Sequence, residues 1–172
     1  NDIATAIDAI IIVSDDDDIE LSGATLTISS NFTTGDILSL STQNGISGSY
    51  SSSTGVLTVS GTASLTNYQA ALRSVKYYSS NEDLTSVFNT RTISWIVIDA
   101  DSDGAGSVNS LEVTSTITIT PTNDLPLITP GDTLAYTENG SSTVIDNSIT
   151  ISDADDDLLL SGTITISSGF TA

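Results

Sequence analysis

The sequence predicts an antiparallel β-sandwich with one short helix, followed by the start of a second, similar unit. Three observations carry this prediction: apolar residues alternate with Ser and Thr along most of the chain, short strand-like runs are separated by turn residues, and the N-terminal segment recurs near the C-terminus. Period-two alternation is typical of strands with one buried and one solvated face. Roughly seven strands in about 120 residues suit a sandwich.

The expected strands follow this alternation along the chain. The last two strands of the first unit are the clearest, at 92–97 and 111–119, where Ile, Val and Trp alternate with Ser and Thr. Residues 51–55 should close a hairpin, with Gly55 at a positive φ. Five earlier strands are expected at 8–14, 21–30, 36–42, 46–50 and 55–60.

One segment departs from the period of two and predicts a short helix that crosses the sandwich. Thr66 and Gln69 match a capping box, and Arg73 would lie in the last turn, where a cation suits the helix dipole. The apolar stripe is better explained by packing than by an aromatic binding surface. Its members are Leu65, Tyr68, Leu72 and Val75.

The chain contains an internal repeat. An ungapped comparison pairs residues 1–34 with residues 139–172 and finds about half of the positions identical, which indicates a tandem array cut from a longer protein. The second copy also identifies the buried face of 8–14. Ile10 and Ile12 become Ser148 and Thr150, whereas Ile11 and Val13 correspond to Ile149 and Ile151.

A proline-rich segment separates the two units. Pro121, Pro126 and Pro130 fall within ten residues, and proline stiffens the backbone while removing a ladder donor. We therefore expect residues 1–122 to form a sandwich repeat without its first strand, and residues 123–172 to form the linker and the N-terminal part of the next repeat. About three strands are too few to close a core, so 123–172 should be loosely ordered or supported by a neighbouring chain.

Composition excludes several function classes. The chain carries 22 acidic residues against 3 Lys or Arg, a net charge of −19, which opposes contact with nucleic acid. Cys, His and Met are absent, so disulfides, zinc sites, thiol nucleophiles and imidazole chemistry are excluded. The longest apolar run, Ala9–Val13, is far too short to insert into a membrane. We expect a folded, non-enzymatic protein.

The acidic residues are clustered rather than dispersed. Eleven of the 22 fall in three groups, 15–18, 99–103 and 153–157. Asp99, Asp101 and Asp103 precede Gly104 in an alternating series like the first half of an EF-hand loop, but the second half is absent and the flanks are strands. Adjacent carboxylates repel one another, which cations would relieve.

Strand order predicts where these groups meet. The turn at 15–18 and the loop at 99–103 should lie at one end of the sandwich, with the linker and loop 81–83 at the other. Oxygen-only ligands in this number suit Ca²⁺. The alternative is that these are simply solvated acidic turns. End-to-end stacking of repeats would bring four further oxygen ligands together at the junction: Asn123, Asp124, Asp153 and Asp155.

These features resemble cadherin-like repeats, and more closely the tandem cadherin-like repeats in the extender regions of giant bacterial surface adhesins. The motifs concerned are the Asn123-Asp124 linker, the Asp-x-Asp pairs at 15/17 and 153/155, the acidic turn before the last strand, and the segments 44–50, 55–58 and 68–75. The resemblance implies an immunoglobulin-like fold, calcium ligands at Asn123, Asp124, Asp153 and Asp155, and Glu138 as the first-strand glutamate. The mid-repeat Leu-Asp-Arg-Glu motif of that family is not found.

The resemblance implies a calcium-rigidified extender on the bacterial cell surface, whose partners are neighbouring repeats and possibly like chains. A ligand-binding or homophilic adhesion module is the main alternative, with Tyr50, Tyr77 or Tyr78 as contacts. A carboxylate-based glycosidase is less well supported, because the acids lie in turns and aromatic residues make up only 5% of the chain. A Ser/Lys dyad using Lys76 is the weakest option.

Overall fold

The computed structural model describes residues 3–84 and 89–169. The chain divides into two units, Asn1–Pro121 and Thr122–Ala172. Among the residues described, the first contains nearly all of the regular secondary structure, and the second contains two short strands.

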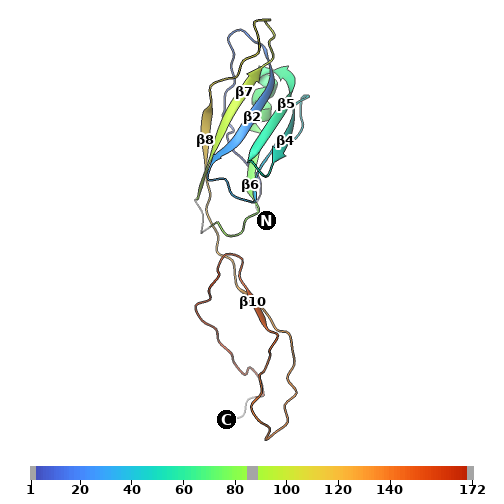
Figure 1. The fold of residues 1–172 in the computed structure, drawn as a ribbon, viewed down its shortest axis with the longest axis vertical. Helices are drawn as coiled ribbons and strands as arrows, with labels where there is room; N and C mark the ends of the chain where they lie inside the picture. Colours follow the sequence, from blue (N-terminus) through green and yellow to red (C-terminus); the bar gives the residue numbers. More distant parts are fainter. Residues whose placement is uncertain (1–2, 85–88, 170–172) are drawn as a thin grey trace. The chain divides into compact units, whose positions relative to one another are not determined.

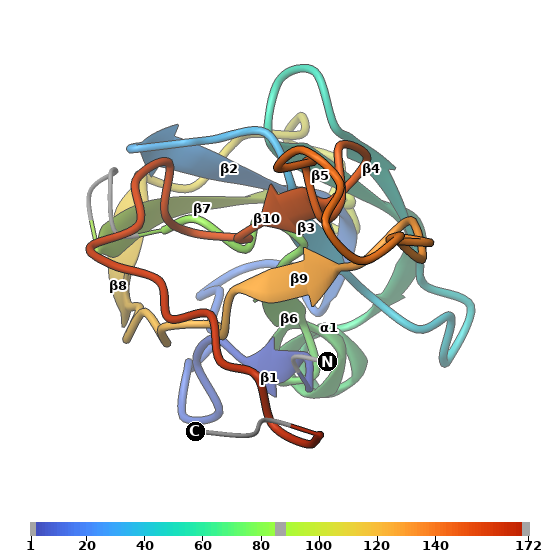
Figure 2. The same ribbon diagram turned by 90° about the horizontal axis from the view of Figure 1, so that it is seen from below.

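In its described residues, the first unit is an antiparallel sandwich with one helix, which confirms the predicted fold class (Figures 1 and 2). One sheet has five strands in the order β4-β5-β2-β7-β8, and the other has three in the order β1-β6-β3. The elements are β1 (Thr5–Ala6), β2 (Glu20–Ser30), β3 (Asp36–Ser39), β4 (Ser47–Ser51), β5 (Val56–Ser64), α1 (Leu65–Arg73), β6 (Lys76–Ser79), β7 (Thr90–Asp99) and β8 (Val113–Thr118).

The hydrophobic core lies between the two layers. Alternation along β2 and β7 turns one face of each strand inward, and α1 packs its apolar stripe against the same core, so the packing interpretation of Tyr68 is confirmed. Figure 2 shows α1 beside β6 of the three-stranded sheet, and the helix also contacts β5 and β2. The core includes Leu26, Ile28, Ile93, Trp95, Tyr68 and Leu72.

The segment 8–14 differs from its prediction, because it is not a strand. Helix side chains take the place of a ladder: the Val13 N–H donates to Gln69 Oε1 at 3.1 Å, and Arg73 Nε donates to the Ile11 carbonyl at 2.9 Å. The prediction of which side of this segment is buried is nevertheless correct. Ile11 and Val13 are half-buried against the core, whereas Ile10 is 82% exposed.

The helix begins one residue before the predicted capping box. Ser64 is the N-cap, and its hydroxyl accepts the Asn67 N–H at 3.3 Å. The capping-box prediction for Thr66 and Gln69 is therefore wrong, which leaves Gln69 available for Val13. Arg73 lies in the last turn, as predicted.

The remaining strands lie near their predicted positions. The hairpin between β4 and β5 closes as expected, with the Gly55 N–H donating to the Ser51 carbonyl and Gly55 at φ 69°. Strand β6 was not among the expected strands, and β7 extends on both sides of the predicted 92–97. Strand β6 is too short for the alternation of apolar and polar residues alone to reveal it.

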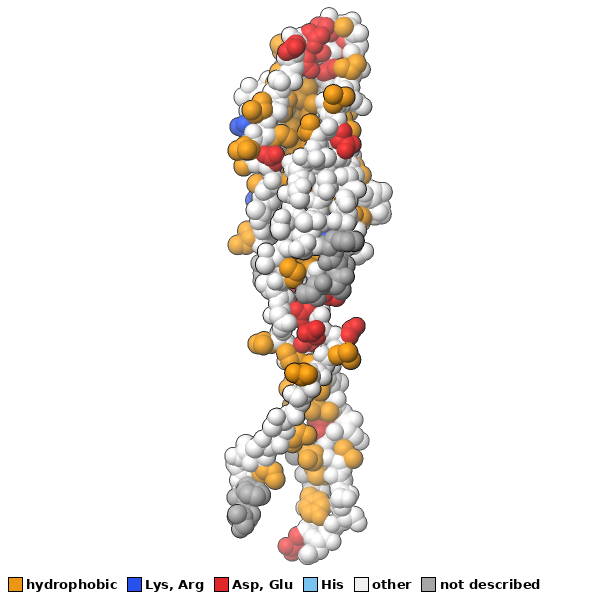
Figure 3. Space-filling model, turned by 90° about the vertical axis from the view of Figure 1, so that its left-hand side faces the viewer, with side chains coloured by type: hydrophobic (Ala, Val, Ile, Leu, Met, Phe, Trp, Pro, Cys, Tyr) orange, Lys and Arg blue, Asp and Glu red, His pale blue; other side chains and the backbone are white. Residues whose placement is uncertain are grey.

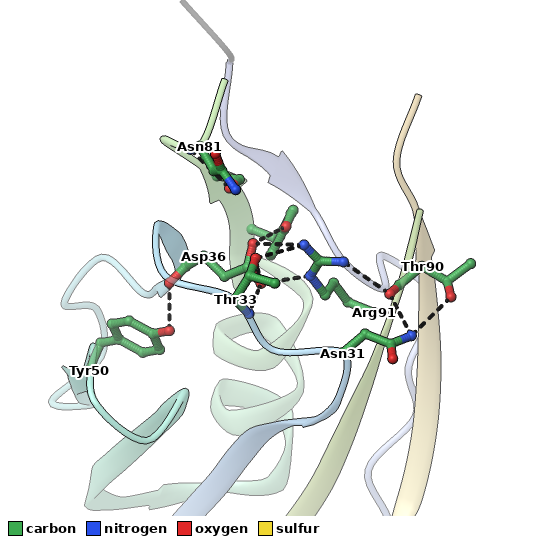
Figure 4. Close-up of polar contacts among 9 residues, drawn as sticks. Asn31, Thr33, Asp36, Tyr50, Asn81, Thr90 and Arg91 are labelled. Carbon is green, nitrogen blue, oxygen red and sulfur yellow. Dashed lines mark hydrogen bonds and ion pairs between the residues drawn. The ribbon is translucent and has the colours of Figure 1, made fainter. Parts of the chain in front are cut away.

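A buried ion pair joins the two layers (Figure 4). Arg91 of β7 donates to Asp36 of β3 with a Nε–Oδ2 distance of 2.6 Å, and both side chains are fully buried. The Tyr77 hydroxyl donates to Asp36 Oδ1, and the Thr33 N–H and hydroxyl donate to Oδ2. Tyr50 donates to the Asp36 backbone carbonyl. Strands β3, β4, β6 and β7 therefore converge on one aspartate.

Residues 122–169 of the second unit form no such core. Its strands β9 (Leu127–Thr129) and β10 (Thr150–Ser152) pair antiparallel, with Ile151 opposite Ile128. No residue among 122–169 is buried. The half-buried residues of this stretch are four aspartates: Asp124, Asp146, Asp153 and Asp155. Carboxylates, not apolar side chains, therefore organise this unit.

Breaking the ion pair should destabilise the first unit strongly. Arg91→Met leaves a buried carboxylate without its cation, for which we expect a loss of about 3–5 kcal/mol in unfolding free energy. Urea unfolding followed by fluorescence of Trp95, the one tryptophan of the chain, measures this. Lys76→Met, at an exposed position of β6, is the control and should change stability by less than about 0.5 kcal/mol. Equal stabilities of the two variants would contradict this role for the pair.

The same pair predicts a pH dependence. Burial alone would raise the pKa of Asp36, but hydrogen bonds from Arg91, Tyr77 and Thr33 outweigh it and hold the pKa below its ordinary value. The stabilisation is complete above the unfolded-state pKa of about 3.9 and is lost as the pH falls through the lowered folded-state pKa. The stability difference between the wild type and Asp36→Asn should therefore shrink on acidification to pH of about 2. A constant difference across urea titrations from neutral to acid pH would refute this assignment.

Candidate metal centres

The turn before β2 gathers three carboxylates in the first unit. Asp15, Asp17 and Asp18 each offer one oxygen, and these oxygens lie within 4.8 Å of one another. We refer to such a set of three neighbouring aspartate side chains as a carboxylate group. Backbone hydrogen bonds shape the turn, because Asp15 Oδ1 accepts the N–H groups of Asp17 at 3.3 Å and Asp18 at 3.1 Å. The turn therefore holds like charges together by its own backbone.

The second unit repeats this arrangement at the equivalent positions. Asp153, Asp155 and Asp156 form the same group within the same 4.8 Å limit. Asp153 Oδ1 accepts the N–H groups of Asp155 and Asp156, both at 3.2 Å. Because the two turns share sequence and hydrogen bonding, the carboxylate group is a property of the repeat.

The loop at 99–106 closes onto the first turn, as the predicted strand order requires. Asp18 Oδ1 accepts hydrogen bonds from the Ser102 N–H, the Ser102 hydroxyl and the Asp103 N–H. The Ile19 N–H donates in return to the Ser102 hydroxyl at 3.2 Å. Residues 80–84 lie at the opposite end of the sandwich. Gly35, the start of β7 and the end of β8 lie at the same end. In Figure 3, acidic side chains gather at one end of this unit.

The three loop aspartates have different surroundings. Asp99 is buried, and both of its oxygens are engaged: Oδ1 accepts the Asp101 N–H at 3.1 Å and Oδ2 accepts the Val108 N–H at 2.7 Å. Asp101 and Asp103 are exposed, and each accepts one backbone N–H through Oδ1. Asp99 therefore shapes the loop, and Asp101 and Asp103 have an oxygen free of hydrogen bonds from described residues.

The linker reaches the carboxylate group of the second unit. The Asp124 N–H donates to Asp155 Oδ2 at 3.0 Å. Asn123 is exposed and donates through Nδ2 to the Asp124 carbonyl at 2.8 Å. Glu138 is exposed and belongs to neither carboxylate group among the described residues. Of the four expected junction residues, the structure brings Asp124, Asp153 and Asp155 together.

One oxygen at this site has no hydrogen-bond partner. Asp155 Oδ1 is shielded from solvent and accepts no hydrogen bond from the described part of the chain. A shielded carboxylate oxygen without a donor is costly. A cation is one group that could compensate it.

The pKa values of the aspartates in the two turns reflect the crowding of like charges. In the first turn, the side chain and charge of Asp15 raise the pKa of Asp17, with a further contribution from Asp103. In the second, the Asp124 N–H favours the charged form of Asp155, but the side chain and charge of Asp153, together with burial and Asp124, leave the pKa raised. Backbone N–H groups of Asp18 and Asp17 lower the pKa of Asp15, and the side chain of Asp155, followed by backbone N–H groups, lowers the pKa of Asp153.

Asp146 has a different role from the clustered acids. Its two oxygens accept the N–H groups of Gly131, Asp132 and Ser148, together with the Ser148 hydroxyl. These donors, Gly131 first, lower the pKa of Asp146 to about 2. Three of the four contacts come from turn backbone N–H groups, so Asp146 acts as a structural link within the second unit.

Both groups have the chemistry of a hard-cation site. They offer several carboxylate oxygens from one short turn, without nitrogen or sulfur ligands, which matches Ca²⁺ better than transition metals. Sequence patterns alone did not single out Asp18 and Asp156 as ligands, although both belong to the groups. The repeat pairing, which matches Asp17-Asp18 with Asp155-Asp156, could have identified them.

Two of the three tyrosines considered as adhesive contacts, Tyr50 and Tyr77, have structural roles. Tyr50 and Tyr77 are half-buried against the core and donate their hydroxyls to Asp36. Burial, with the charge of Asp36, raises the pKa of Tyr50 to about 12. Tyr78 is also half-buried.

Comparisons with known proteins identify no relative: no family model, no curated protein and no solved structure matches the chain. Among the described residues, no helix has the length and apolar character needed to cross a membrane.

Replacing Asp17 should stabilise the cation-free protein. Its pKa is raised, so ionisation at neutral pH disfavours the folded state, and the neutral amide of Asp17→Asn removes this repulsion. In chelator at pH 7 we expect a higher Tm than for the wild type, and the gain should disappear in acid, where the carboxyl is protonated. Asp16→Asn changes the same charge in the same turn but outside the carboxylate group, and should have a smaller effect. Identical Tm changes for both variants would show that only net charge matters.

Proposed function

We propose that the chain is a non-catalytic, calcium-stabilised structural repeat of an extracellular bacterial surface adhesin. The observation that carries this proposal is the recurrence of one carboxylate group at equivalent positions of both units. In the second unit, a shielded oxygen of Asp155 has no hydrogen-bond partner among the described residues. A turn that holds three like charges together twice in one chain is best explained by a bound cation.

Calcium is the favoured ion for reasons of coordination. It accepts six to eight oxygen ligands in flexible geometry, whereas Mg²⁺ demands a near-ideal octahedron and releases water reluctantly. In the second unit, the triad and Asp124 would supply carboxylates and the linker would supply backbone or Asn123 carbonyls. In the first, Asp101 and Asp103 would add to Asp15, Asp17 and Asp18.

The mechanism is electrostatic and mechanical. A cation would neutralise the repulsion that raises the pKa values of Asp17 and Asp155. Because the Asp124 N–H already contacts Asp155, a cation there would fix the linker segment to the turn. Repeats whose linkers are fixed in this way would resist bending and proteolysis, which suits a spacer that holds a binding domain away from a cell.

Thermal unfolding tests the proposal directly. Extracellular calcium modules bind with Kd of about 10⁻⁴–10⁻³ M, so the melt is followed in chelator and in calcium or magnesium at several millimolar. A ligand at about 10 times its Kd adds about 1.4 kcal/mol per site, a rise of several degrees in Tm. We expect that rise with calcium and a much smaller one with magnesium. Equal melts in all three conditions would favour solvated acidic turns.

Substitutions locate the ions. Calorimetric titration of calcium into the wild type should show binding at both carboxylate groups. Asp17→Asn should weaken calcium binding at the first group, and Asp155→Asn at the second, each by at least about tenfold, or about 1.4 kcal/mol. Asp132→Asn removes an acid of the second unit outside its carboxylate group and should leave both intact. An equal effect of Asp132→Asn would indicate diffuse screening.

A further inference from the structure

The second unit exposes a strand-like segment that is apolar on one side. Residues 158–168 carry no charge, and their pattern of Leu, Ile, Ser and Thr favours a strand. The large side chains are open to solvent, with Ile164 91% and Ile166 68% exposed. Among the described residues, none pairs with this segment in a ladder.

The first unit shows what covers the same segment when it is folded. Residues 158–168 correspond to 20–30 in the repeat, which is strand β2, the middle strand of the five-stranded sheet. There, Leu26 and Ile28, the counterparts of Ile164 and Ile166, are 0% and 4% exposed. Strand β5 pairs with β2 along one edge and β7 along the other.

Any partner that covers residues 158–168 must therefore meet two requirements at once. It must cover alternate apolar side chains, and it must supply backbone donors and acceptors on both edges of the segment. A lipid or a small apolar ligand meets only the first need. Polypeptide strands meet both, and the absence of charge over 158–168 allows an apolar strand to approach without repulsion.

We propose that residues 158–168 are an acceptor strand that takes two antiparallel strands from a polypeptide with the alternation of β5 and β7. Leu57 and Val59 in β5, and Ile93 and Trp95 in β7, define the apolar side that faces the core of the first unit. Partner strands should place residues of this kind beside Ile164 and Ile166. This inference is independent of the calcium proposal.

Register-specific disulfide formation tests it, since the chain has no cysteine of its own. In the first unit Thr27 lies opposite Ser94, and the counterpart of Thr27 is Thr165. The full chain with Thr165→Cys is incubated in a glutathione buffer with a synthetic peptide of residues 90–99 that carries Ser94→Cys. We expect the mixed disulfide to exceed, by at least about tenfold, that formed with an Ile93→Cys peptide, whose cysteine faces the other side of the strand.

A matched variant controls for simple thiol reactivity. Thr27→Cys places the same thiol on β2, where β7 of the same chain already occupies the edge, so the peptide should add little. Mixed disulfide without register preference, or none at all, would overturn the proposal. Predominant disulfide between two Thr165→Cys chains would also overturn it and identify a second copy as the occupant. Repeating the reaction in chelator and in calcium keeps its outcome separate from that of the metal proposal.

Discussion

The pairing of Arg91 with Asp36 is the constraint around which the first unit is arranged. One carboxylate receives Arg91 from β7, Tyr77 from β6 and Thr33 from the turn before β3, while Tyr50 of β4 reaches its backbone. A buried charge tolerates few alternative partners, so this centre specifies how the two sheets face each other, whereas the apolar core only requires that they meet. Tyr50 and Tyr77, two of the three tyrosines considered as adhesive contacts, therefore serve this centre.

Much of the sandwich could be predicted because its strands repeat a simple alternation that sequence displays directly. The prediction failed at 8–14, where alternation is present but Gln69 and Arg73 provide the hydrogen bonds that a neighbouring strand would have provided. It also missed the Asp36 centre, since nothing in the sequence pairs an isolated Asp with an Arg 55 positions later. Such long-range polar contacts depend on the completed topology, which local patterns do not encode.

The acidic turns were predictable in position and less so in detail. Clustering and repetition pointed to Asp15, Asp17, Asp153 and Asp155, and strand order correctly brought loop 99–103 to the first turn. The different roles of the aspartates in that loop could be identified only from the structure. Asp99 and Asp101 have the same chemistry, but only Asp99 has backbone donors on both of its oxygens. Whether a carboxylate shapes a loop or faces outward depends on a few ångströms of backbone path.

The acidic turn of the second unit lies directly beside a segment that is prone to self-association. The aspartates at 153 and 155–157 immediately precede the uncharged residues 158–168, whose β-branched alternation is typical of sequences that stack into cross-β aggregates. Charges flanking such a segment act as gatekeepers that keep separate chains apart during folding. A cation that neutralised them would remove this protection, so the ionic conditions under which a chain meets its first cations would affect whether it assembles or aggregates.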